Sequence, residues 1–88
     1  MTPRLLSEFF DLDCDATVRQ ILLAEIRTHG TEKTDVVREF NFNQFNIYLD
    51  FQNRQVKVED ELDVSEQGSC FVSLAEFAAA LNDHKPLR

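Results

Sequence analysis

Hydrophobic side chains in the first third of the chain recur at helical spacing. Thr2 followed by Pro3 is typical of a helix start, because threonine caps a helix and proline is tolerated at its first position. The apolar side chains that follow are spaced to share one helix face: Leu5, Leu6, Phe9 and Phe10. This pattern predicts a short first helix over residues 3–10.

A second helix is predicted over residues 16–29, where good helix formers continue until Gly30 ends the pattern. Its N-cap comes either from the acidic segment 11–15 or from a capping box of Thr17 and Gln20. Its expected buried stripe is Val18, Ile21, Leu22 and Ile26.

After a polar loop over residues 31–35, the period changes from helical to alternating. Four large apolar residues alternate with polar ones and define one face of a strand: Phe45, Ile47, Leu49 and Phe51. Further strands are predicted over 37–42, before the short connection at Asn43 and Gln44, and over 56–58, after the turn at Gln52 and Asn53. The third strand either continues to Val64 or breaks within 59–61.

The last third of the chain predicts a turn, a strand and a helix. A turn at 66–68 precedes a short strand over 70–72, and Ser73 with Glu76 forms a capping box. The final helix buries Leu74, Phe77, Ala78 and Leu81. Residues 83–88 are expected to form a frayed tail.

We therefore expect a single α+β domain over residues 1–88. It has two N-terminal helices, an antiparallel meander of three to four strands, and a C-terminal helix packed on one face of the sheet. Composition supports a folded chain, since 43% of its residues are hydrophobic and eight are phenylalanine. No apolar segment is long enough to cross a bilayer, and the two cysteines form no CxxC motif. These features predict a cytoplasmic protein with reduced thiols and no membrane partner.

The net charge of the chain indicates which kind of partner it binds. Nine Lys and Arg against sixteen Asp and Glu give a formal charge of −7. This charge repels phosphate backbones and anionic lipids, so we expect a basic protein partner and no nucleic acid. The alternative is that the acidity serves only solubility.

Motifs of catalysis and metal binding are incomplete. Asp11, Asp13 and Asp15 alternate like the first ligands of an EF-hand, but Ala16 and Leu22 replace the required Gly and Glu. These acids are better interpreted as residues at a helix N-terminus. Residues 13–17 match a DxDxT phosphatase motif without the length such a fold needs. We predict no metal, no cofactor and no catalytic residue.

The densest charge lies in residues 59–66, called here the acidic run. It contains five acids, no base and two apolar residues, and its predicted partner-binding residues are Glu59, Asp60, Glu61, Asp63 and Glu66. Such clustering suits electrostatic steering of a basic partner. An acidic loop that protects an exposed sheet edge is the other interpretation.

Small size, acidity, a meander and a closing helix over 73–77 together resemble the immunity proteins of bacterial toxin systems, including contact-dependent growth inhibition. The resemblance covers about residues 45–81. It implies a stoichiometric inhibitor whose acids meet the basic nucleic-acid-binding cleft of a nuclease toxin. Other possibilities are a nucleic-acid mimic with carboxylates at phosphate-like intervals and a small structural or adaptor subunit with an exposed apolar patch.

Overall fold

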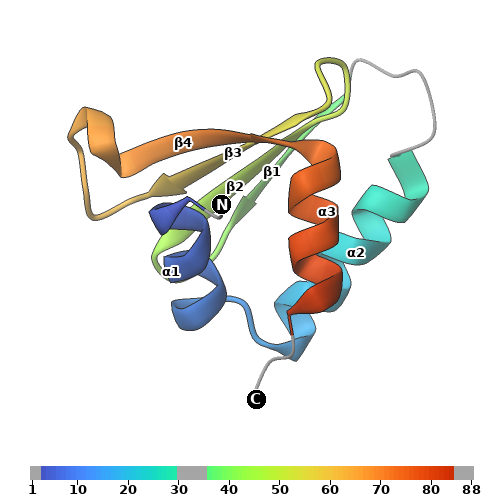
Figure 1. Ribbon diagram of the computed structural model, residues 1–88, viewed down its shortest axis with the longest axis horizontal. Coiled ribbons are helices and arrows are strands. Elements are labelled where there is room, and N and C mark those ends of the chain that lie inside the picture. The colour runs from blue at the N-terminus through green and yellow to red at the C-terminus, as the bar shows by residue number, and fades with distance from the viewer. Residues whose placement is uncertain (1–2, 30–35, 85–88) are drawn as a thin grey trace.

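The computed structural model describes residues 3–29 and 36–84, and it arranges them in two layers (Figure 1). One layer holds the helices α1 (Arg4–Leu12), α2 (Ala16–His29) and α3 (Leu74–Asp83). The other is a sheet of β1 (Val37–Asn41), β2 (Phe45–Asp50), β3 (Gln55–Asp60) and β4 (Ser69–Ser73). A short 3-10 helix, η1 (Glu66–Gly68), precedes β4.

The sheet is an antiparallel meander in the order β1-β2-β3-β4, so each strand pairs with its neighbour in sequence. α3 contacts β3 and β4. The predicted α+β class, with two N-terminal helices and a C-terminal helix on one sheet face, is confirmed. β3 ends at Asp60, so the break expected within 59–61 occurs and the strand does not continue to Val64.

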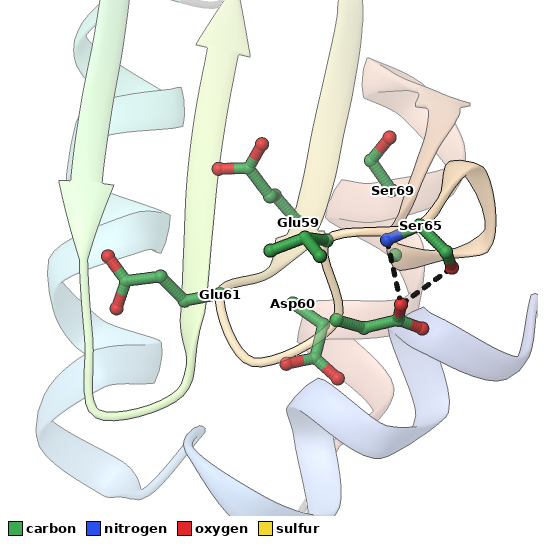
Figure 2. A pocket seen from close by; sticks show the side chains of 8 residues that line it. Glu59, Asp60, Glu61, Ser65 and Ser69 are labelled. Carbon is green, nitrogen blue, oxygen red and sulfur yellow. Dashed lines mark hydrogen bonds between the residues drawn. The ribbon is translucent and has the colours of Figure 1, made fainter.

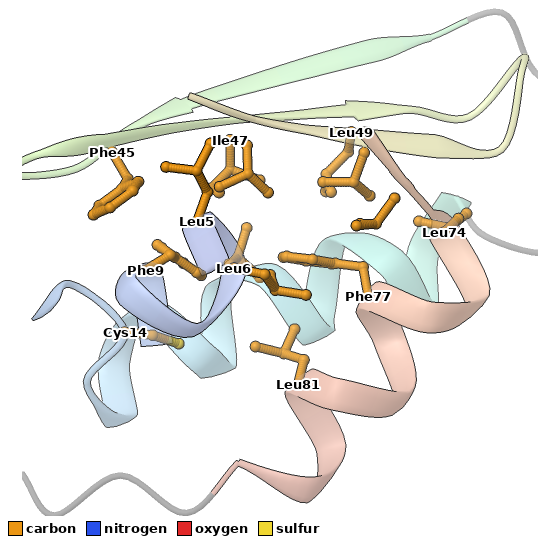
Figure 3. Packing of buried hydrophobic residues seen from close by; sticks show 14 of the residues in the cluster. Leu5, Leu6, Phe9, Cys14, Phe45, Ile47, Leu49, Leu74, Phe77 and Leu81 are labelled. Atoms are coloured by element: carbon orange, nitrogen blue, oxygen red, sulfur yellow. The ribbon is translucent and has the colours of Figure 1, made fainter. Parts of the chain in front are cut away.

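Alternation along β2 decides which sheet face is covered. Phe45, Ile47 and Leu49 are fully buried, and they point with Val56 and Val58 of β3 toward the helices. Figure 3 shows this layer of side chains between the sheet and the three helices. Period-two burial of this kind is what one covered and one open sheet face produces.

Phenylalanine rings form the centre of the core. Phe9 of α1 lies 6.0 Å from Phe45 in an edge-on arrangement and 6.4 Å from Phe77 in a stacked one, measured between ring centroids. All three side chains are fully buried. One continuous apolar cluster therefore joins α1, β2 and α3.

The structure corrects several local predictions. α1 extends to Leu12, two residues beyond the predicted end. α2 has the predicted bounds, but Leu22 is its one fully buried residue, and Ile21 of the expected stripe is 43% exposed. Asp15 caps α2, because its Oδ1 accepts a hydrogen bond from Val18 N at 2.9 Å, so the alternative capping box at Thr17 is wrong. The stop at Gly30 lies outside the described residues.

The end of the chain is more ordered than predicted up to His84. α3 includes Asp83, and the amide of His84 donates to the carbonyl of Ala80 at 3.0 Å. The His84 ring stacks on Phe10 at 4.9 Å, and its Nε2 lies 3.0 Å from the carbonyl oxygen of Cys14. A carbonyl oxygen only accepts, so Nε2 carries the hydrogen. Residues 85–88 of the predicted tail lie outside the described part of the chain.

The N-terminus of α3 matches its sequence signal. Ser73 Oγ accepts a hydrogen bond from Glu76 N at 3.0 Å, which is the serine half of the predicted capping box. Leu74, Phe77 and Leu81 are buried as expected, and Ala78 is partly buried.

Phe77→Ala should lower the free energy of unfolding by about 3 to 5 kcal/mol, because it leaves a cavity where a fully buried ring packs against Phe9. Phe71→Ala is the matched control, since Phe71 is 61% exposed on β4. Urea denaturation of this control should show a change below about 1 kcal/mol. Equal losses in the two variants would contradict the assigned packing of α3.

Candidate acidic docking site

The acidic run leaves the end of β3, crosses an exposed loop and enters η1 before β4 begins (Figure 2). Its side chains border a hollow of about 270 Å³. The residues that line this hollow are Glu59, Asp60, Glu61, Asp63, Val64, Ser65, Gly68 and Ser69. The structure therefore brings four of the five predicted binding acids together, and Glu66 lies at the start of η1 beside them.

The first half of this loop is bonded to the β1–β2 hairpin through Gln44. The Gln44 amide Nε2 lies 3.3 Å from both carboxylate oxygens of Asp60, and the Gln44 carbonyl accepts from Glu61 N at 2.8 Å. Asp60 Oδ1 also accepts from Leu62 N at 2.9 Å, which turns the chain away from the sheet. Both carboxylate oxygens of Asp60 therefore accept hydrogen bonds from donors within the protein.

Gln44 is itself held by Asp13, which follows α1. One carboxylate oxygen of Asp13, Oδ2, accepts from Gln44 N and from Phe45 N, each at 2.8 Å. Asp13 is 7% exposed, and such charge-assisted bonds are about twice as strong as neutral ones. The interpretation of Asp13 as a helix N-terminal acid is therefore wrong, although it holds for Asp15.

The second half of the loop folds back on itself. Asp63 Oδ1 accepts from Ser65 N at 3.0 Å and from Ser65 Oγ at 2.6 Å (Figure 2), and these bonds lower the pKa of Asp63. Ser65 Oγ in turn accepts from Gln67 N at 3.2 Å and caps η1. A methyl group on Gly68 would lie 1.9 Å from the carbonyl oxygen of Asp63, so only glycine fits beneath the fold-back.

Glu59 faces the open side of the sheet, and its carboxylate contacts three donors. Its Oε1 accepts from Asn46 Nδ2 and from the Tyr48 hydroxyl, each at 3.1 Å, and its Oε2 lies 3.5 Å from Lys57 Nζ. The Asn46 hydrogen bond is the main cause that lowers the pKa of Glu59, with smaller contributions from Tyr48 and Lys57 against the effect of burial.

The five predicted acids thus divide into two groups. Glu59, Asp60 and Asp63 accept hydrogen bonds that shape the loop, whereas Glu61 and Glu66 are exposed and their carboxylates accept none from the described residues. Lys57 is the one cation within 4 Å of any of these carboxylates among residues 3–29 and 36–84. Apart from Glu59, the acids of the run form no ion pair with a described residue, although the charge of Arg4 also contributes to the lowered pKa of Asp63.

Sequence reasoning missed the residues that support the run, namely Asp13, Gln44, Asn46 and Tyr48. The polar positions of the alternating strand identify Asn46 and Tyr48 as outward-facing, which was an available signal. No local pattern pairs Asp13 with Gln44, because the two residues are 31 positions apart.

Other reactive groups offer little chemistry. Burial raises the pKa of the Cys14 thiol to about 12 and also raises that of Cys70, so both free thiols stay protonated near neutral pH. His29 pairs with Glu25 at 3.3 Å at the end of α2.

Within the described ranges, no group of three His, Cys, Asp or Glu side chains could hold a metal ion. No helix in that part of the chain is long and apolar enough to span a membrane.

Comparison with protein-family models, with curated proteins and with solved structures gives no match for this chain. The likeness to immunity proteins accordingly rests on the sequence pattern alone.

In the Glu59→Gln variant, the free energy of unfolding should depend less on pH in the acidic range than in the wild type. The pKa of Glu59 is lowered in the folded state, so its contribution is present above the unfolded pKa of about 4.5 and is lost as the pH falls through the folded value. The variant should be less stable than wild type at neutral pH, and the difference should shrink by pH 3.

Urea denaturation at several pH values measures this difference, with Glu66→Gln as the matched control because its carboxylate has no internal partner among the described residues. A gap between wild type and Glu59→Gln that stays constant across pH would contradict the account, because the three contacts to Glu59 would then not favour its ionised form.

Proposed function

We propose that this protein is a non-catalytic binding module that neutralises a basic protein partner through its acidic run. The observation that carries the proposal is a built and exposed loop whose carboxylates, Glu59 apart, have no cation within 4 Å among the described residues. Unneutralised charge held in one place attracts an oppositely charged surface and speeds encounter with it.

Preorganisation of the loop supports binding over simple solubility. Solubility needs only scattered charge, whereas here Asp60, Asp63 and Gly68 each hold the backbone in one conformation. A loop ordered before contact loses less conformational entropy when a partner binds. The acids are therefore presented in a fixed geometry.

Exposed apolar residues within the run favour a protein partner. Leu62 is 78% exposed and Val64 is 99% exposed, and both lie among the acids. Protein interfaces combine an apolar centre with a polar rim. The same run repels phosphate backbones, which disfavours a nucleic-acid ligand.

A nuclease toxin is the partner that best fits this surface. Its nucleic-acid-binding cleft is basic, and an acidic inhibitor seated in it would block substrate by occupying the same charges. The sequence resemblance to immunity proteins leads to the same class of partner. A stoichiometric inhibitor needs no catalytic group, and it would act in the cytoplasm alongside its target.

Neutralising the two acids without internal partners tests steering with the least damage to the loop. Glu61→Gln with Glu66→Gln should slow association with a captured basic partner by about tenfold at low salt, and the on-rate should depend less on ionic strength. The matched control is Glu76→Gln with Asp83→Asn, which removes equal charge from exposed positions on α3.

Stopped-flow measurements at low and physiological salt separate the two variants. Equal on-rates and equal salt slopes in both would mean that only net charge matters, and the acidic run would have to be abandoned as the contact surface.

A further inference from the structure

The open face of the sheet carries a row of side chains that crosses all four strands. Glu39 pairs with Tyr48, Tyr48 with Lys57, and Lys57 with Phe71, so these residues lie side by side on the face opposite the core. The described helices all lie on the other face (Figures 1 and 3). This row, called here the outer row, therefore has no described element over it.

Aromatic surface and negative charge meet in the outer row. Phe71 is more than half exposed at the β4 edge, and Lys57 Nζ lies 5.4 Å from the centroid of the Tyr48 ring. Lys57 is the one base that the strands place on this face, and it is already paired with Glu59. The row therefore ends in the Glu39 carboxylate on β1, which has no ion-pair partner among the described residues, and in the Phe71 ring on β4.

Three carboxylates from different elements act on Tyr48, and one of them, Glu59, accepts a hydrogen bond from its hydroxyl. Partial burial is the main cause that raises the pKa of Tyr48, followed by its bond to Glu59 and by the charges of Glu59, Glu39 and Glu61. Glu59 belongs to the acidic run and accepts a hydrogen bond from Tyr48 of the outer row at 3.1 Å, so the run and the outer row adjoin.

Asn46 gives an independent indication of binding, because one acceptor on this face has no hydrogen-bond donor within the described residues. It lies in the neighbouring row between Asn41 and Glu59, and it is 5% exposed although no described element covers its face. Its Nδ2 donates to Glu59, but its Oδ1 has no hydrogen-bond partner. A buried acceptor left unpaired costs free energy that an incoming N–H donor would recover.

We propose that this open sheet face is the docking face for the basic partner, which inserts an arginine among Glu39, Glu59 and Glu61 and places an apolar side chain against Phe71. The inference rests on the proposed function and extends its contact surface from the loop to the sheet. Arginine fits better than lysine, because its planar group offers five N–H donors to a set of acceptors from several strands.

A phage-displayed random peptide library selected on the intact chain tests this chemistry without a known partner. Selected peptides should combine arginine with a neighbouring apolar residue. Synthesised binders should bind Phe71→Ser and Glu39→Gln at least about tenfold more weakly than wild type, the loss expected for a central contact. Ile21→Ser is the matched control, because it removes an exposed apolar side chain from the helical layer, and it should change affinity less than about twofold.

Peptide-induced amide shifts in the wild-type chain give a second readout that does not depend on a variant folding. They should centre on Glu39, Tyr48 and Phe71. Shifts confined to residues 59–66, with Phe71→Ser binding normally, would overturn the docking face and leave the acidic run as the binding site. Binders without positive charge would overturn both proposals, and a library that yields no binder would overturn the docking face.

Discussion

The buried carboxylate of Asp13 connects the two layers of this protein. It accepts two backbone N–H groups at the turn between β1 and β2, and thereby ties the segment after α1 to the start of the central strand. Gln44 continues the connection, since its side chain and carbonyl hold Asp60 and Glu61. A chain of hydrogen bonds thus runs from the helical layer to the acidic run.

This connection explains how a small domain can hold so many like charges in one loop. Repulsion among acids favours an extended and mobile loop. Here three of the acids are used as acceptors for donors within the protein, so their charge is partly compensated while the backbone is fixed. Glu61 and Glu66 remain available to a partner. Shape and charge in the run are therefore supplied by different residues.

Sequence periodicity predicted the elements well because local spacing determines them. The alternation from Phe45 to Phe51 identified β2 and its buried face, and the serine cap identified the start of α3. The clustering of acids over 59–66 likewise identified an exposed loop. These features depend on residues within one element, where a short window contains the whole signal.

What the sequence did not predict depends on contacts between distant segments. Asp13 looks like any acid near a helix, and only its position beside Gln44 makes it an anchor. His84 looks like part of a polar tail, yet it stacks on Phe10 and bonds to Cys14. Glu59 and Asp60 could not be distinguished from Glu61 and Glu66, because their donors come from β2 and from Gln44.

Hydrogen exchange in Asp13→Asn tests most directly whether this buried carboxylate organises the acidic run. The substitution keeps the shape of the side chain but removes the charge that strengthens its two bonds. The amides of Glu61 and Leu62, which do not contact Asp13 and are bonded to Gln44 and Asp60, should exchange about tenfold faster than in the control Asp15→Asn, which alters only the cap of α2. Equal protection of these two amides in both variants would contradict the account, because the acidic run would then be ordered independently of Asp13.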